Sequence, residues 1–172
     1  MTEVPVLETA RLRLRGFREG DLDPQAAALA DPEIVRHVGN VRLTREEAWR
    51  RMLASDGLWS MLGYGYWCVE RRQDGAYLGQ VGFADFKRDL EPSFEGIPEM
   101  GWIFAAHAHG QGYASEAVAA GIAWADAHLE APQLCCIIAP ENAPSIRVAV
   151  KAGFVETERS SYKGEPTIIF RR

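Results

Sequence analysis

Gly110, Gln111 and Gly112 stand directly before a segment with helical periodicity that begins at Tyr113. Glycine has no Cβ, so the backbone at Gly110 and Gly112 can come close to a ligand. The first four N–H groups of a helix have no partner inside it, and the helix dipole adds partial positive charge at that end. A glycine loop that leads into a helix start therefore suits an anion, above all a phosphate or pyrophosphate.

Two common phosphate motifs do not fit this loop. The Rossmann pattern G-x-G-x-x-G needs a third glycine, and that place holds Ser115. A Walker A loop needs lysine followed by serine or threonine after a glycine, a combination that the chain lacks. What remains is an x-x-x-G-x-A turn from His109 to Ala114, which leads from a strand into a helix. A nicotinamide-dinucleotide oxidoreductase would also need a repeated βαβ unit, and the sequence has none.

This turn resembles the CoA-binding signature Q/R-x-x-G-x-G/A of the GNAT N-acetyltransferases. Residues Gly110–Ala117 are most similar to the RimJ/RimL-type branch, which acetylates ribosomal-protein N-termini and various small amines. His109 stands where the signature has glutamine or arginine, at a position that mainly supports the loop. The segment Thr9–Arg15 also resembles the first strand of this branch.

A second motif lies at the expected distance from the loop. Asn142-x-x-Ser145, followed by Lys151–Phe154, resembles the N-x-x-S and K-x-G-F segments of the same branch. The resemblance implies acetyl-CoA as cosubstrate, and the four histidines lack metal-ligand spacing, so no metal is expected. The residues expected to contact CoA are Ile103, Phe104, Ala105, Gly110, Gln111, Gly112, Tyr113, Ala114, Ser115, Asn142 and Ser145.

Acyl transfer from a thioester needs a donor for the oxyanion and a hydrogen bond for the leaving thiolate. The resemblance implies that a backbone N–H between Ile103 and Ala105 serves the oxyanion, where this strand splays from its parallel neighbour. Such amides give roughly 3 kcal/mol each. Many family members have a tyrosine four residues before the Gly-Phe pair to serve the thiolate. Here that place holds Ala149, and Ser145 is the substitute, unless its hydroxyl merely satisfies helix backbone.

The attacking amine must also lose a proton. Glu99 is the first candidate for this catalytic base, because it lies a few residues before the expected reaction centre and the resemblance places an acidic residue there. Its structural alternative is an ion pair at the strand edge. Other candidates are Glu95, Glu91, His107 and a base that acts through water, and no dedicated base is needed if the acceptor has a low pKa.

Two other groups have structural interpretations. Glu116 lies in the first turn of the glycine-loop helix, where a carboxylate stabilises the dipole and points away from a bound phosphate. Cys135 and Cys136 fall in an apolar strand without an activating histidine, which favours direct attack by the amine over transfer through a cysteine.

Composition limits the class of protein. The chain has 172 residues, of which 47% are hydrophobic and 25% charged, so we expect one domain over residues 1–172. Its net charge of −5 argues against direct nucleic-acid binding. No apolar run is long enough to span a membrane, and Met1–Arg15 lacks the apolar core of a signal peptide, so the expected location is cytoplasmic. A homodimer is common in the branch that the chain resembles.

The pattern of apolar residues predicts strands and helices in the order β-α-α-β-β-β-α-β-α-β-β. The segment at 56–65 is expected to be a loop that either lines the acceptor site or covers the sheet. The expected strands are Leu7–Phe17, Tyr66–Arg71, Tyr77–Phe86, Glu99–Phe104, Leu134–Ile138, Phe154–Tyr162 and Thr167–Arg171. The expected helices are Leu22–Ala30, Arg45–Ala54, Tyr113–Leu129 and Ala143–Ala152, with a short turn at Glu33–His37.

This order is that of the GNAT fold, an α/β fold with a central mixed sheet of six to seven strands and about four helices. The resemblance implies an acetyl-CoA-dependent N-acetyltransferase, in which a primary amine of a protein N-terminus or a small molecule attacks the thioester directly. The alternative is a non-catalytic acyl-CoA-binding module, which the missing tyrosine at Ala149 keeps open.

Overall fold

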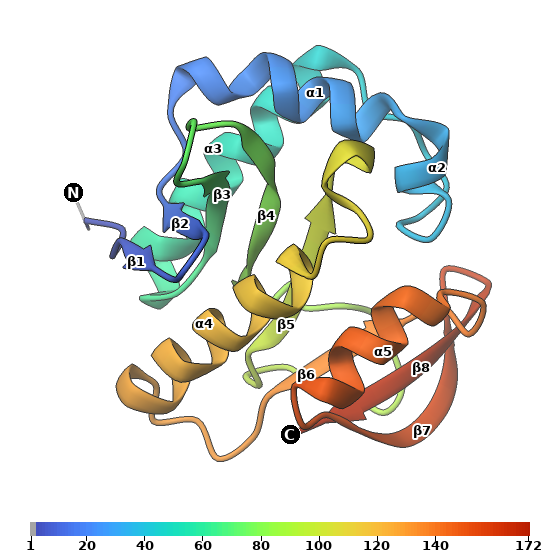
Figure 1. The fold of residues 1–172 in the computed structure, drawn as a ribbon. Coiled ribbons are helices and arrows are strands. Elements are labelled where there is room, and N and C mark those ends of the chain that lie inside the picture. The colour runs from blue at the N-terminus through green and yellow to red at the C-terminus, as the bar shows by residue number, and fades with distance from the viewer. Residues whose placement is uncertain (1–2) are drawn as a thin grey trace.

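A computed structural model describes residues 3–172, whose strands form one eight-stranded sheet in the order β1-β2-β3-β4-β5-β6-β8-β7 (Figure 1). Residues 1 and 2 lie outside the described part. They belong to the domain predicted over residues 1–172 and to the segment Met1–Arg15 that was examined as a possible signal peptide. The strands are β1 (Leu7–Glu8), β2 (Leu12–Arg15), β3 (Tyr66–Arg71), β4 (Tyr77–Ala84), β5 (Glu99–Phe104), β6 (Cys135–Ile138), β7 (Val155–Tyr162) and β8 (Glu165–Arg171).

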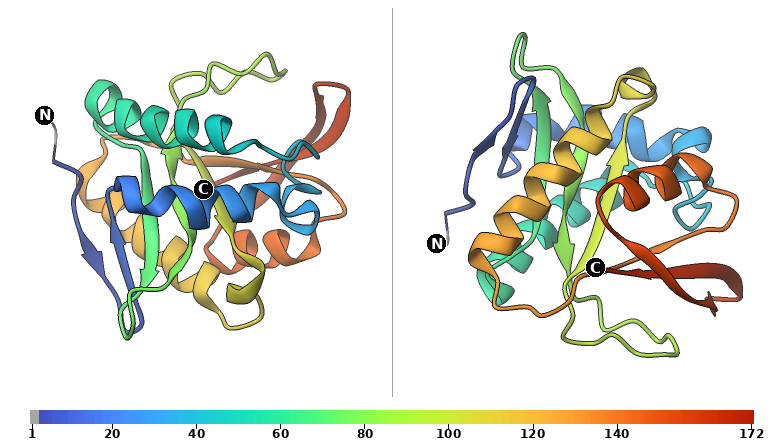
Figure 2. Two further views of the ribbon diagram at one scale, coloured as in Figure 1. Left: turned by 90° about the horizontal axis from the view of Figure 1, so that it is seen from above. Right: turned by 60° about the horizontal axis from the view of Figure 1, so that its bottom comes forward.

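Helices cover both faces of this sheet. In Figure 1, α4 lies in front of the strands and α3 behind them, and the turned views in Figure 2 show the same arrangement. The helices are α1 (Leu22–Ala30), α2 (Pro32–Val35), α3 (Arg45–Leu62), α4 (Tyr113–His128) and α5 (Ala143–Lys151), with short 3-10 turns η1 (Glu19–Asp21) and η2 (Ala106–Ala108). Among the described residues, no helix is long and apolar enough to cross a membrane.

The predicted α/β mixed sheet of the GNAT fold is confirmed, but the predicted strand number is too low. The single strand expected over Leu7–Phe17 is instead a tight hairpin of β1 and β2. Leu7 pairs with Leu14, and Thr9 N donates to Leu12 O at 2.9 Å. Apolar residues alternate with arginines only from Leu12 onward, so this pattern does not reveal the turn that separates Leu7 from β2.

The loop predicted at 56–65 is also wrong, because α3 continues to Leu62 before Gly63 ends it with a φ of 75°. Gly57 lies inside the helix, where a single glycine is tolerated. The continued helix buries Trp59 against Trp67 and Trp124 in edge-to-face contacts with centroids 4.8 and 5.3 Å away. This part of the segment therefore covers the sheet.

The elements around the glycine loop agree closely with the sequence. Strand β5 has the predicted bounds, and it pairs in parallel with β6 as the crossover through α4 requires. Helix α4 is held near the sheet by its small residues, and a Cβ on Gly121 would lie 3.0 Å from the Met100 Cε. Strand β5 therefore lies between β4 and β6, and the glycine loop follows its end.

Candidate active site

The two parallel strands at the centre of the sheet pair at one point and then diverge. Strand β5 pairs with β4 over its whole length. Within the described chain, its parallel partner β6 pairs with it only at Glu99 and Cys135. Beyond that pair β6 runs with β8, and Figure 1 shows β5 and β6 separating. We call the opening beside Met100–Phe104 the β5–β6 notch.

One edge of β5 turns its backbone groups into this notch. At one end Pro98 O accepts from Cys135 N at 3.1 Å, toward β6, and at the other Ala105 N donates to Leu78 O at 2.8 Å, toward β4. Successive residues of a strand turn their N–H and C=O to opposite sides. The residues whose backbone faces the notch are therefore Met100, Trp102 and Phe104.

This alternation shows which of the amides proposed from the sequence for the oxyanion face the notch. Phe104 N–H faces the notch, whereas those of Ile103 and Ala105 face β4. Trp102 N–H also faces the notch, and the sequence did not reveal it because the open edge depends on where β6 departs. His109 Nε2 lies 2.9 Å from Phe104 O and ties the glycine loop to β5, which confirms that position 109 supports the loop.

The glycine loop follows directly after β5. Gly110 and Gly112 have φ angles of 73° and 79°, a region that residues with a Cβ rarely adopt. Within the described residues, no protein group accepts a hydrogen bond from the amides of residues 110–115. The next amide, Glu116 N, donates to Gly112 O at 3.1 Å. The expected unpaired amides are thus confirmed, and they fit the anionic pyrophosphate of CoA.

Arg11 and Glu116 join this loop to the β1–β2 turn. Glu116 accepts from Thr9 Oγ1 at 2.6 Å, from Arg11 N at 2.9 Å and from Arg11 Nε at 2.8 Å. Arg11 also donates to Gln111 O at 2.9 Å and lies 4.4 Å from the centroid of the Tyr113 ring. The structural interpretation of Glu116 is confirmed. Burial raises its pKa, but the bonds from Thr9 and Arg11 outweigh burial and the net shift is downward.

Helix α5 presents the second predicted motif after β6. Asn142 caps it, as its Oδ1 accepts from Ser145 N at 3.3 Å. Among the described residues the Ser145 hydroxyl forms no hydrogen bond, so it does not satisfy helix backbone. Ala149, where many relatives have a tyrosine, is fully buried. The only hydroxyl in the described part of this motif is therefore that of Ser145.

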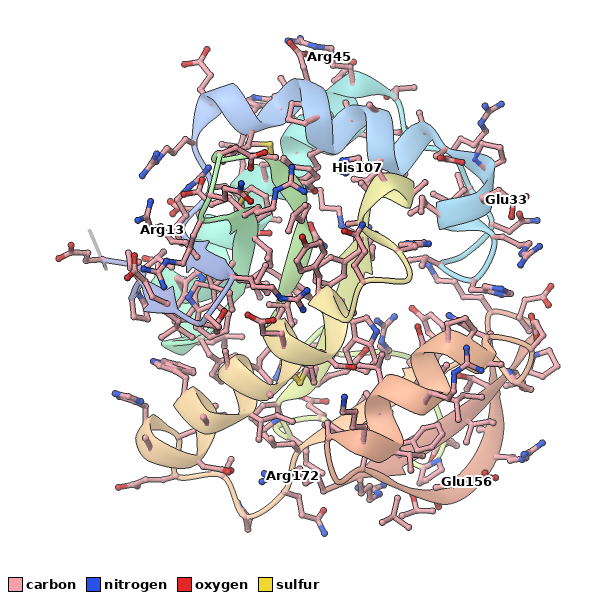
Figure 3. All side chains as sticks on the ribbon, viewed as in Figure 1. Arg13, Glu33, Arg45, His107, Glu156 and Arg172 are labelled. Carbon is pink, nitrogen blue, oxygen red and sulfur yellow. The ribbon has the colours of Figure 1, made fainter. Side chains whose placement is uncertain are left out.

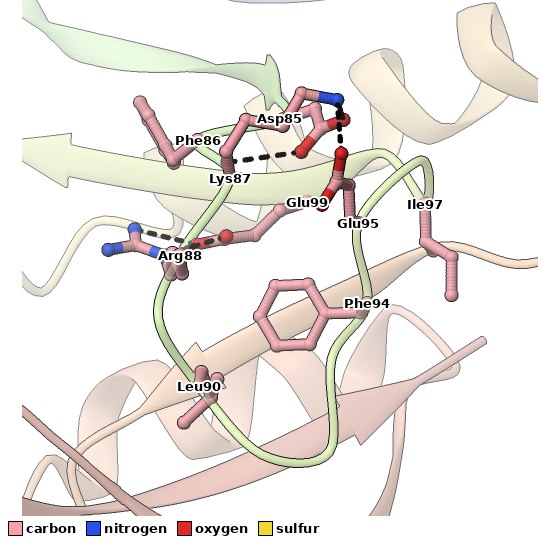
Figure 4. A pocket seen from close by; sticks show the side chains of 9 residues that line it. All are labelled: Asp85, Phe86, Lys87, Arg88, Leu90, Phe94, Glu95, Ile97 and Glu99. Carbon is pink, nitrogen blue, oxygen red and sulfur yellow. Dashed lines mark hydrogen bonds and ion pairs between the residues drawn. The ribbon is translucent and has the colours of Figure 1, made fainter.

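Glu99 is the buried member of an ion pair (Figure 4). Arg88 donates to both of its oxygens, from Nε at 2.8 Å and from the terminal Nη2 at 2.9 Å. The guanidinium carbon also lies over two rings, 4.7 Å from the Phe86 centroid and 4.9 Å from that of Tyr162. Burial lowers the pKa of Arg88, but Glu99 more than offsets it and the net shift is upward. The contacts of Glu99 match its structural alternative, whereas its role as a base stays a prediction.

The other candidate bases lie farther from the notch or in exposed positions. Glu95 is 63% exposed and lies 3.3 Å from Lys87. Glu91 is exposed in the loop between β4 and β5. Figure 3 shows His107 on η2, after the far end of β5 from Glu99, where it too is exposed.

The cysteines are poorly suited to nucleophilic catalysis. Burial raises the pKa of Cys135 to about 12, and it raises the pKa of Cys136 well above its ordinary value. A thiol is a nucleophile in its deprotonated form, so both are inert at neutral pH. Within residues 3–172, no group of His, Cys, Asp and Glu side chains is placed to hold a metal ion.

The sequence analysis did not identify two arginines and one tyrosine that the structure places near the site. Arg11 contacts the glycine loop from about a hundred residues away, and Arg88 holds Glu99 from a charged connection. Tyr66 begins β3, yet its hydroxyl reaches Gly101 on β5. Only the Thr9-x-Arg11 pattern gave any signal, and it was used for the strand alone. The site therefore combines amides for an anion with an open strand edge, whereas the role of Ser145 stays a prediction.

The comparisons with known proteins agree with this geometry. Residues 11–155 match the family model described as an acetyltransferase (GNAT) domain. YkkB of Bacillus subtilis, an uncharacterised protein, is 28% identical, and the match covers 96% of this chain and 94% of YkkB. A GNAT-family acetyltransferase from Bordetella pertussis has a TM-score of 0.85 and 28% identity, over 98% of this chain and 99% of that one.

The ribosomal L7/L12 α-N-protein acetyltransferase RimL, solved with coenzyme A, has the same fold, with a TM-score of 0.78. It is 14% identical, over 98% of this chain and 97% of RimL. The family match spans most of the chain, and it coincides with the open strand edge and the unpaired amides of the glycine loop. The chain therefore belongs to the GNAT acetyltransferase family.

Proposed function

We propose that this protein is an N-acetyltransferase in which a primary amine attacks acetyl-CoA directly. The main support for the proposal is that an open strand edge and a loop with unpaired amides follow one another along the chain at the end of β5. The open edge of β5 offers the amides of Trp102 and Phe104, and the loop that follows offers the unpaired amides of residues 110–115. A pyrophosphate on the loop would direct the pantetheine arm along the open edge and the thioester into the notch.

The reaction forms the amide bond and breaks the thioester. The amine nitrogen attacks the acetyl carbon, and a β5 amide donates to the oxygen as it becomes negative. The C–S bond then breaks, and the Ser145 hydroxyl donates to the departing thiolate. The proton lost by the nitrogen leaves through water. The buried cysteines favour this direct route over one through an acetyl-cysteine.

Among the alternatives for the base, the contacts favour an amine that arrives uncharged. Glu99 could accept a proton only in competition with the hydrogen bonds from Arg88. An α-amine has an ordinary pKa near 8, whereas a lysine amine is near 10.4, so far more of the α-amine is neutral at pH 7. We therefore propose a protein N-terminal amine or a small amine of comparable pKa as the acceptor.

Composition and family membership support further proposals on domain organisation, location, oligomeric state and partners. We propose that the chain acts as one N-acetyltransferase domain over residues 1–172, in the cytoplasm, as a homodimer and without direct nucleic-acid contact. The net charge of −5 supports the last point and suits a basic acceptor such as a ribosomal protein. Likeness to RimL, which acts on a ribosomal protein, supports the RimJ/RimL-type branch.

A non-catalytic acyl-CoA-binding module is the second candidate, and the apolar Ala149 favours it. Thiol release from acetyl-CoA over a panel of amines and N-terminal peptides separates the two. Turnover with initial-velocity lines that intersect supports direct transfer. Tight CoA binding with no turnover on any acceptor would support the module, and no affinity for CoA would overturn both.

A further inference from the structure

A tyrosine from β3 reaches across the sheet to the start of the notch. Tyr66 pairs with Gly82 of β4, and Gly82 pairs with Gly101 of β5. Neither glycine has a side chain, so the ring can lie across β4. A Cβ on Gly101 would collide with Tyr66 Oη, whereas it would lie 3.4 Å from the ring carbon Cζ. The hydroxyl is therefore the part of Tyr66 that rests on Gly101.

This hydroxyl is unusual because the protein does not use it. The Tyr66 side chain is nearly fully buried, yet across residues 3–172 its Oη has no hydrogen-bond partner. Oη is not among the fully buried side-chain atoms that lack a partner, so this atom keeps some contact with solvent and is accessible to a ligand. Burial and the nearby carboxylate of Glu99 raise the pKa of Tyr66 to about 12, so the phenol stays neutral and is not a base at physiological pH. It remains able to donate and to accept a hydrogen bond.

The position of this hydroxyl relates it to the reaction. Gly101 comes two residues after Glu99, the last residue of β5 that pairs with β6. Side chains alternate along a strand, so Glu99, Gly101 and Ile103 share one face. Ile103 packs with residues of α1 and α3 on that face, whereas Met100 packs toward α4 on the other. The start of α4 carries the loop for the cofactor phosphates, so Tyr66 approaches the notch from the opposite side.

We propose that the Tyr66 hydroxyl binds the nitrogen of the acceptor amine at the base of the notch and positions it for attack. This inference rests on the proposed acetyltransferase function. The phenol oxygen accepts one N–H of the amine, which leaves the nitrogen lone pair free to face the acetyl carbon. With Glu99 already bound to Arg88, the hydroxyl is the unused polar group on this side of β5 at Gly101.

Replacement of Tyr66 by phenylalanine tests the proposal. The hydroxyl has no partner to lose in the free protein, so Tyr66→Phe should keep the thermal midpoint and the KM for acetyl-CoA. The value of kcat/KM for the acceptor should fall about tenfold, as expected for loss of one hydrogen bond. The matched control is Tyr77→Phe, which removes the phenol of a half-buried tyrosine at the start of β4, the other end from Gly82, and should leave all constants unchanged.

A second variant, at Gly101, tests the position of the Tyr66 Oη atom. The methyl group of Gly101→Ala would displace Tyr66 Oη, so it should reproduce the loss of acceptor kcat/KM. In a Tyr66→Phe background it should add little, because the colliding atom is gone.

The outcomes separate this inference from the function on which it rests. If the wild-type enzyme acetylates an amine and Tyr66→Phe does so equally well, the inference is wrong and the function stands. A lower midpoint in Tyr66→Phe, or an equal loss for acetyl-CoA and acceptor, would show that the hydroxyl is structural. A wild-type protein that acetylates none of the amines in the panel would overturn both.

Discussion

Arg88 binds Glu99 through both carboxylate oxygens, at 2.8 to 3.1 Å, and holds this carboxylate at the point where β5 and β6 part. The only carboxylate on β5 is therefore engaged by a cation before any substrate arrives. We expect this pairing to leave Glu99 less available to the acceptor amine, and a substitution tests that directly.

Replacement of Glu99 by glutamine should lower stability more than it changes the chemistry. The variant leaves Arg88 without its counter-charge in a largely buried position, which should reduce the free energy of unfolding by about 1 to 3 kcal/mol. A general base contributes typically about 10²- to 10⁴-fold to the rate. We expect a smaller loss of kcat and an unchanged shape of the pH–rate profile. A loss above a hundredfold at unchanged stability would instead identify Glu99 as the base.

Replacement of Arg11 by alanine should weaken CoA binding without affecting the acceptor. The variant removes the hydrogen bond to Gln111 O and the contact with the Tyr113 ring, so the glycine loop loses a support. We expect the KM for acetyl-CoA to rise about two- to tenfold, with the acceptor KM unchanged. Arg13→Ala is the matched control, since Arg13 pairs with Glu8 and Glu70 away from the loop. Equal effects of the two variants would contradict the assignment.

Replacement of Ser145 by alanine should slow release of the thiolate. A hydrogen bond to a charged group contributes about 1.5 to 3 kcal/mol, so kcat should fall at least tenfold while CoA still binds. The helix should persist, because Asn142 caps it through the backbone of residue 145 and not through the hydroxyl. Steady-state kinetics together with a CoA titration would check this. Full activity in Ser145→Ala would show that the thiolate leaves without this residue.

The pH dependence of stability should reveal a second buried carboxylate. Burial raises the pKa of Asp21, but the bonds from Arg15 and from Arg18 N outweigh it, so the folded pKa lies below the ordinary 3.8. The stabilisation is therefore present above pH 3.8 and disappears as the pH falls through the lower folded value. Asp21→Asn should cost about 3 kcal/mol at pH 7, and its difference from wild type should shrink below pH 3.8.

Urea unfolding from pH 7 down to pH 2.5 would measure this difference. The matched control is Asp23→Asn, which removes an exposed partner of Arg45 and should change the midpoint little. A difference between wild type and Asp21→Asn that stays constant over the whole range would contradict the role of its ionisation.

The sequence predicts the local features of this fold well and the distant contacts poorly. The bounds of β5, the cap at Asn142 and the helix start after Gly112 all follow from neighbouring residues. The β1–β2 turn and the length of α3 do not, since the alternation begins only after the turn and the last turns of α3 pack through Trp59 on residues far away in the chain.

The site shows the same division. The unpaired amides of the loop can be predicted, because a helix start after two glycines leaves them free. The contact of Arg11 with Gln111 and the reach of Tyr66 to Gly101 join residues far apart in the chain. The place where β6 departs from β5 depends on the pairing of β6 with β8, and no pattern within either strand encodes it.

Beyond Glu99, one edge of strand β5 has no neighbouring strand to pair with among the described residues. Exposed strand edges attract other extended chains, and many proteins recognise peptides by letting them join such an edge. Here the open edge lies inside the sheet, between β5 and the departing β6, where the proposed pantetheine arm could pair with it. The cosubstrate would then fill the gap between β5 and β6 for as long as it is bound.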